Sequence, residues 1–177
     1  MLKECKSTIT AAVLALGLLA GCSKSSNTTT TAYIDFTAGN TQENFDVTAS
    51  NASIVNNLYL LTLTATATQG TAGNIVINLA GTTPFATNDV FSNAYVTGTN
   101  TLQAKVEYVP DETQSLDYIS LPLQDSLSRV VVRLTAVTSA SIKGTFTASL
   151  VSRADTTVIA STLTSGTFYA PFAQPVQ

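Results

Sequence analysis

The chain has 177 residues, a formal net charge of −3 and only eight Lys and Arg residues. Nucleic-acid binding needs clustered positive charge, so this composition argues against a nucleic-acid partner. The chain contains no histidine, which removes the commonest general base and the commonest transition-metal ligand together. A Ser-His-Asp or Cys-His site cannot be built, and a zinc site would need carboxylates alone. The composition therefore predicts no catalytic residues, no metal site and no cofactor.

The first 21 residues have the layout of an export signal. Lys3 and Lys6 make the start of the chain positive, and an almost wholly apolar run follows from Ile9 to Ala20. This run is the length of a signal-peptide core and is shorter than the roughly 20 apolar residues that a membrane-spanning helix needs. The small residues before Cys22 predict cleavage between Gly21 and Cys22. A plain secretory signal with an incidental cysteine is the alternative.

The segment Leu19-Ala20-Gly21-Cys22 resembles the lipobox of bacterial lipoproteins. In that family the cysteine thiol is alkylated with diacylglycerol, and the amine freed by cleavage takes a further acyl chain. Two or more chains anchor a protein stably, whereas one holds it only marginally. The resemblance implies lipid attachment at Cys22 and a membrane partner reached through that lipid. Ser23 and Lys24 follow the cysteine, and by resemblance to known sorting behaviour they favour the outer membrane, with the leaflet left open.

The remaining chain divides into a tether and one domain. Residues 22–31 comprise the cysteine and a polar run, SKSSNTTTT, that has almost no apolar side chain to place in a core. Nine such flexible residues reach on the order of 15–18 Å. Residues 32–177 are enough for a single domain that buries roughly 70% of its surface on folding. Cys5 lies in the signal, so we expect no disulfide within the mature chain.

From Tyr33 onward the sequence alternates apolar and polar residues with the period of two that is typical of strands. The clearest case is the run from Tyr59 to Thr68, in which one face is apolar and the other is rich in threonine. Pro110-Asp111 predicts a turn, and Pro122 suggests that the strand after this turn lies at an edge. The stretch from Thr82 to Asn100 is less regular and is expected to hold a loop or one helical turn. We expect about nine strands, and the pattern appears in ten stretches: residues 33–38, 43–50, 58–68, 74–81, 102–109, 116–123, 129–137, 141–151, 156–162 and 165–172.

These strands predict an all-β fold, and an antiparallel β-sandwich is favoured because each apolar sheet face needs a second layer. A closed β-barrel is the alternative. The triplets Gly144-Thr145-Phe146 and Gly166-Thr167-Phe168 echo each other near the end of the chain. We expect each glycine to relieve crowding, or to mark a bulge, beside an inward-facing aromatic ring. This C-terminal arrangement resembles that of small uncharacterised β-sandwich lipoproteins of Gram-negative bacteria, a group with no established activity to carry over.

The candidate ligand-binding residues are Tyr108 and Tyr118, which flank the predicted turn at Pro110. Two aromatic rings brought together across a hairpin are able to stack on the apolar face of a sugar, whereas packing in the core or at an edge is the structural alternative. A threonine ladder on the strand to Thr68 is similar to ice-binding arrays, but only one series is present, so an ordinary solvent-facing strand is favoured.

The carboxylates have two possible chemical roles, as acid/base pairs and as calcium ligands. Asp35 and Asp46 lie in or beside strands that are able to meet across a sheet, but their spacing is not diagnostic of a glycosidase pair. Asn88-Asp89 and Asp111-Glu112 offer oxygen ligands without the dense loop that calcium sites use. Solvated turn and edge positions are the favoured interpretation.

Three functions from different classes remain open. The leading hypothesis is a non-enzymatic, lipid-anchored cell-envelope protein with an adhesion, binding or structural role, whose partner is a glycan or another envelope protein. The second is a carbohydrate-binding accessory lipoprotein of an outer-membrane uptake system, which would display an aromatic platform. The third is a glycoside hydrolase that uses carboxylates alone, which would need two close carboxyl groups in a deep cleft. The ligand and the oligomeric state are not fixed by the sequence.

Overall fold

The computed structural model describes residues 30–69, 73–93, 102–114, 116–122 and 127–176. Contacts divide the chain into a unit ending at Thr30 and a second unit, Thr31–Gln177, which contains all the strands. The predicted signal peptide, with its predicted cleavage at Gly21 and lipid attachment at Cys22, lies outside the described residues, as does part of the irregular stretch from Thr82 to Asn100. The described part of the chain has no helix with the length and hydropathy needed to cross a bilayer.

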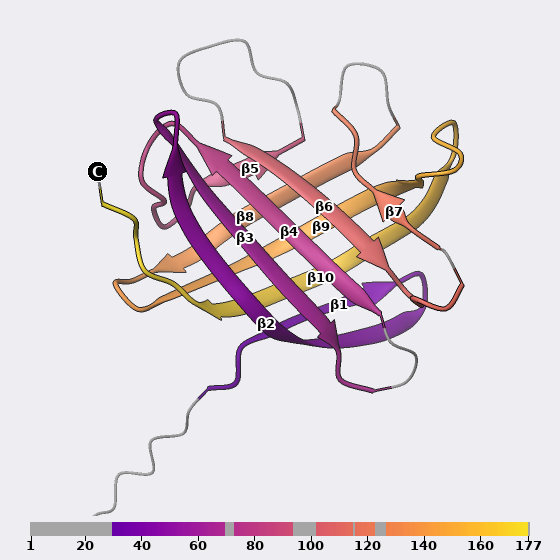
Figure 1. The fold of residues 1–177 in the computed structure, drawn as a ribbon. Coiled ribbons are helices and arrows are strands. Elements are labelled where there is room, and N and C mark those ends of the chain that lie inside the picture. Colours follow the sequence, from indigo (N-terminus) through magenta and orange to yellow (C-terminus); the bar gives the residue numbers. More distant parts are fainter. Residues whose placement is uncertain (1–29, 70–72, 94–101, 115, 123–126, 177) are drawn as a thin grey trace, which may run out of the picture. The chain divides into compact units, whose positions relative to one another are not determined.

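The structure confirms the predicted all-β fold: ten strands within the described residues form one mixed sheet (Figure 1). Its order is β10-β1-β2-β3-β4-β6-β5-β8-β9-β7, and additional pairings join β10 to β9 and β6 to β7. All pairings are antiparallel except the short contact of β5 with β6. The strands are β1 Tyr33–Ala38, β2 Thr41–Val55, β3 Leu58–Ala67, β4 Asn74–Gly81, β5 Val90–Ser92, β6 Gln103–Val109, β7 Tyr118–Ile119, β8 Arg129–Val137, β9 Ser141–Ser152 and β10 Ile159–Pro171.

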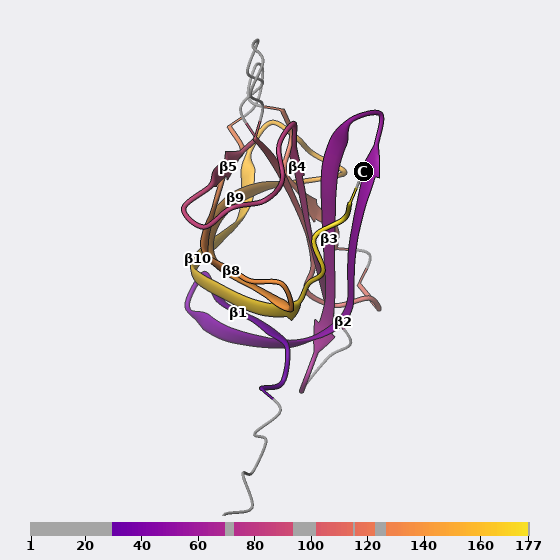
Figure 2. The same ribbon diagram turned by 90° about the vertical axis from the view of Figure 1, so that its left-hand side faces the viewer.

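The sheet folds over so that its two halves face each other, as a sandwich requires. In Figure 1, β3, β4 and β6 cross in front of β8, β9 and β10. Figure 2, turned by 90°, shows β2 and β3 on one side and β8, β9 and β10 on the other, with β1 running between the two sides. Strand alternation places one face of each half inward, and the two inward faces form a common core.

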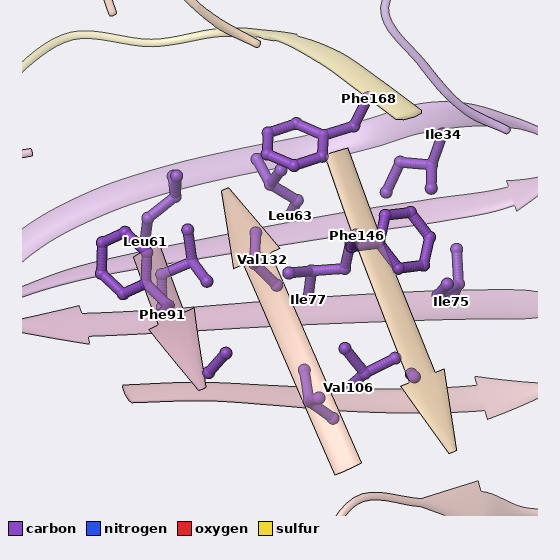
Figure 3. Close-up of a cluster of buried hydrophobic side chains, with 14 of the residues drawn as sticks. Ile34, Leu61, Leu63, Ile75, Ile77, Phe91, Val106, Val132, Phe146 and Phe168 are labelled. Atoms are coloured by element: carbon purple, nitrogen blue, oxygen red, sulfur yellow. The ribbon is translucent and has the colours of Figure 1, made fainter. Parts of the chain in front are cut away.

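The core is built from the alternating residues of both halves (Figure 3). Leu61, Leu63 and Ile77 project from β3 and β4, and Phe146 and Phe168 project from β9 and β10; all are at most 3% exposed. A second group of rings surrounds Phe36 on β1. The Phe36 centroid lies 5.4 Å from that of Phe45, 5.2 Å from that of Tyr108 and 5.9 Å from that of Phe146.

Local chemistry explains the turn between the two longest front strands. Val55 pairs with Leu58, so the hairpin joining β2 to β3 has a two-residue loop, Asn56-Asn57. Both asparagines have positive φ, at 50° and 63°. Two left-handed residues make the turn that matches the twist of paired strands, and asparagine tolerates this conformation better than most residues. The sequence therefore specifies the register of β2 against β3.

The echoed glycine-aromatic triplets form reciprocal pairs between β9 and β10. Gly144 lies opposite Phe168, and Gly166 lies opposite Phe146. A Cβ atom on Gly144 would lie 2.3 Å from the Phe168 ring, and one on Gly166 would lie 2.5 Å from the Phe146 ring. Each ring therefore occupies the space left by the opposite glycine, as expected from the sequence.

Two local expectations are corrected by the structure. The sequence predicts separate strands at residues 156–162 and 165–172, but Ile159–Pro171 form the single strand β10, whose register shifts between Leu163 and Gly166. Ser165, in this irregularity, has a φ of 52°. The strand before Pro122 was expected at an edge, but β7 pairs with both β6 and β9. Pro122 lies beyond the end of β7 and therefore removes no hydrogen bond from it.

Candidate functional site

The structure brings together the two tyrosines predicted from the sequence. Tyr108 on β6 pairs directly with Tyr118 on β7, and their ring centroids lie 6.1 Å apart. Tyr108 is only 3% exposed and also packs against Phe36 and Phe45, while Tyr118 is half-buried. Burial raises the pKa of the Tyr108 hydroxyl far above its ordinary value, and the negative charge of Glu43 adds to this shift. The pair is thus packed against the core, with Tyr118 its more accessible member.

The carboxylates considered in the sequence make local hydrogen bonds. Asp111, 6% exposed, accepts hydrogen bonds from the backbone N–H and hydroxyl of Thr113 and from the Gln114 amide. These bonds hold the pKa of Asp111 below its usual value. Glu112 accepts a bond from Asn74 at 3.0 Å, and Asp89 accepts one from the Ala86 N–H at 2.8 Å. Within the described ranges, no group of three or more His, Cys, Asp or Glu side chains is placed to hold a metal.

A groove of about 680 Å³ lies on the outer side of the sheet, and no sequence pattern indicated it. Its floor lies on β3, β4 and β6. One row of paired residues across these strands is Leu60, Ala80 and Gln103, and the next row is Thr62, Asn78 and Lys105. These side chains alternate with buried residues and therefore point away from the core. The described lining residues are Leu60, Leu61, Thr62, Asn78, Leu79, Ala80, Asn93, Gln103, Ala104, Lys105, Ile119, Ser120, Leu121, Pro122 and Arg153.

The wall of the groove is the segment from Ile119 to Pro122. The Ser120 N–H donates to the Val106 carbonyl at 2.9 Å, and the Val106 N–H donates to the Ser120 hydroxyl at 2.8 Å. Beyond this point the Asn93 side chain holds the segment, because its amide donates to the Leu121 carbonyl at 2.7 Å.

The buried Asn93 side chain links its own segment by hydrogen bonds to Leu121 and to the start of β8, and we call this arrangement the Asn93 clip. Besides its bond to Leu121, its amide donates to the Ser128 carbonyl at 3.1 Å, and its carbonyl accepts the Val130 N–H at 2.9 Å. At 7% exposure, the side chain makes these bonds away from bulk water. Buried polar groups are tolerated when they are hydrogen-bonded in this way. The clip fixes the wall of the groove to the start of β8.

The polar groups of the groove are paired with one another or with side chains beside it. The Thr62 hydroxyl donates to the Asn78 carbonyl at 2.8 Å, which orients that amide. Lys105 forms an ion pair with Glu107, and Arg153 contacts Glu107 at 3.8 Å and donates to Asp117. The hydrogen bond to Asp117 raises the pKa of Arg153, so it stays cationic. The rim thus carries two cations balanced by two carboxylates.

Comparison with known proteins gave no further guide: no protein-family model, no curated protein and no solved structure matches this chain.

Proposed function

We propose that this chain is a non-enzymatic, lipid-anchored cell-envelope protein that binds a ligand in the groove over β3, β4 and β6. The groove is the observation that carries the binding role. Its volume of about 680 Å³ falls within the range of roughly 300–1,000 Å³ typical of small-molecule sites. The lipid anchor is supported by the resemblance of Leu19–Cys22 to a lipobox and by the polar tether that follows it.

The lining chemistry favours one kind of ligand. Leu60, Ala80 and Leu121 offer apolar surface, and Asn78 and Gln103 offer amides that both donate and accept hydrogen bonds. The rim cations are already balanced by carboxylates, so an additional net charge on the ligand finds no excess partner. The groove therefore suits a molecule with an apolar body and a neutral hydrogen-bonding group.

Binding is favoured over catalysis by the same lining. None of its described residues is an aspartate or a glutamate, whereas a carboxylate-only hydrolase needs two of them in the cleft. Glu107 and Asp117 are engaged in ion pairs beside the groove. The groove as described thus supplies contacts and hydrogen bonds to a ligand without a general acid and base.

The binding role is tested with Nile red, a neutral apolar dye with a carbonyl acceptor. Ala80→Phe fills the floor of the groove, and we expect it to abolish the blue-shifted fluorescence of the bound dye. Val76→Phe is the matched control, since Val76 points to the same side of β4 but does not line the groove. Equal dye binding by wild type and Ala80→Phe, with both proteins folded, would show that the groove is not the site.

The anchor is tested separately by replacing Cys22 with serine in cells fed a labelled fatty acid. We expect the wild type to carry label and to sediment with membranes, and the Cys22→Ser variant to lose both properties. Equal membrane association and an absence of label in both proteins would contradict the anchor while leaving the groove untouched.

A further inference from the structure

The part of the sheet around β1 and β10 carries an aromatic pair on its solvent side. Tyr33 on β1 is the direct partner of Tyr169 on β10, and their ring centroids lie 6.4 Å apart at an interplanar angle of 34°. Each tyrosine alternates with a buried residue, Ile34 and Phe168 respectively, so both rings point away from the core. Both are half-buried, so part of each ring remains accessible.

Hydrogen-bonding side chains border this pair on one side. Tyr33 pairs across β1 and β2 with Asp46, and Asp35, two residues along the same face, pairs with Thr167 and Asn44. Direct cross-strand neighbours have Cβ atoms about 4.5–5.5 Å apart, so the carboxylates lie within reach of a molecule resting on the rings. Burial raises the pKa of Asp35, and the nearby charge of Asp46 raises it further, which agrees with two carboxylates facing the same small area.

Cations border the other side. The Lys143 ammonium lies 5.2 Å from the centre of the Tyr169 ring. Thr145 on β9 pairs with Thr167 on one side and with Arg133 on the other, which places Arg133 in the row next to the tyrosines. Lys143 therefore faces Asp46 across the two tyrosines. In the neighbouring row, Arg133 faces Asp35 across two threonines. This balance suits an uncharged ligand rich in hydroxyl groups, because such a ligand both accepts from cations and donates to carboxylates.

We propose that Tyr33, Tyr169 and the flanking Asp35 and Asp46 form a binding site for a neutral polysaccharide. The apolar C–H face of a sugar ring stacks on a tyrosine, and the sugar hydroxyls donate to the carboxylates. Tyrosine serves this role well because its ring is apolar and its hydroxyl is polar. The four side chains stand on three neighbouring strands, which hold them more rigidly than loops would. The site is separate from the groove, which lies over β3, β4 and β6.

The test is binding of the full chain, purified in detergent, to a panel of neutral insoluble polysaccharides that includes cellulose, chitin and starch. Titration calorimetry with soluble oligosaccharides of the polysaccharide that is retained then measures affinity. We expect the Tyr33→Ala, Tyr169→Ala double variant to bind at least about tenfold more weakly, which corresponds to about 1.4 kcal/mol. Asp46→Asn keeps the shape of the exposed side chain and is expected to weaken binding several-fold.

Two controls separate this site from its alternatives. The Tyr33→Phe, Tyr169→Phe double variant keeps both rings and should retain most of the affinity, which also guards against a folding defect in the alanine variant. Tyr118→Ala removes a ring from the other tyrosine pair and should bind as the wild type does. The proposal is overturned if no polysaccharide is retained, if the folded alanine double variant binds normally, or if neutral phospholipid vesicles are bound in place of glycans. None of these outcomes bears on dye binding in the groove.

Discussion

Replacing Gly144 with alanine probes the reciprocal glycine-aromatic pairs of β9 and β10. The new methyl carbon would lie 2.3 Å from the Phe168 ring and 2.6 Å from the Arg133 carbonyl oxygen. Phe168 is 1% exposed, so its ring has no solvent to move into. The Arg133 oxygen belongs to the backbone of the neighbouring strand, so relieving this contact requires β8 and β9 to shift apart.

The expected cost follows from these distances. Overpacking a well-filled core typically costs about 1–3 kcal/mol, and the backbone contact places Gly144→Ala at the upper part of that range. For a domain of this size, each kcal/mol lowers the Tm by roughly 2–4 °C, so we expect a fall of roughly 4–12 °C. Thermal and urea unfolding, both followed by far-UV circular dichroism, measure the change.

Three variants make the reasoning refutable. Gly166→Ala should cost a similar amount, because its methyl carbon would lie 2.5 Å from the Phe146 ring. Gly39→Ala has no atom within 4 Å of the new carbon and should cost only the strain of a φ of +60°, about 1 kcal/mol. Combining Gly144→Ala with Phe168→Leu should recover part of the loss. If Gly144→Ala is no more destabilising than Gly39→Ala, the interlocking argument is wrong.

Three further predictions concern polar side chains. Asn93→Asp keeps the acceptor for the Val130 N–H but loses both donated bonds, so we expect about 2–4 kcal/mol lower stability by urea unfolding, and an unchanged midpoint would refute the clip. The pKa of Asp35 is raised in the folded state, so the folded domain binds this proton more tightly and its stability falls as pH rises through that pKa. Asp35→Asn should therefore stabilise the domain at pH 7 and lose this advantage at acidic pH, as urea unfolding at several pH values would measure. The pKa of Asp111 is lowered, so its contribution is present above the ordinary aspartate pKa and lost as pH falls through the folded value, and Asp111→Ala should flatten that acid limb of the stability profile.

The fold was largely predictable because alternation survives in nearly every strand. In the run from Tyr59 to Ala67 the predicted apolar face is buried at Tyr59, Leu61, Leu63 and Ala65. The predicted hairpin at Pro110 places Tyr108 opposite Tyr118. The alternation was misleading in β10. The register shift between Leu163 and Gly166 interrupts the period of two there, so the sequence predicted two strands where the structure has one. A period of two reports the direction of a side chain only while the ladder is regular.

The sites were less predictable, because they depend on which strands become neighbours. Tyr33 and Tyr169 each alternate with apolar residues, so an outward direction was available from the sequence for both. They stand at opposite ends of the domain's sequence, and only the pairing of β1 with β10 brings them together. The groove likewise depends on the chain after β7 lying beside β6, a placement fixed by Ser120 and Asn93 that has no periodic signal.

The pairing of the first strand with the last also sets when the domain can finish folding. β1 has two partners, β2 and β10, and β10 is the last of the ten described strands to be synthesised. Contacts between residues so far apart in the sequence form slowly, because the entropy of closing a long loop is lost before the contacts stabilise the fold. A nascent chain that ends after β9 therefore has β1 paired on one edge only, with β2. Deleting residues 166–177 would therefore remove strand partners from β1, the first strand of the domain, as well as from β9.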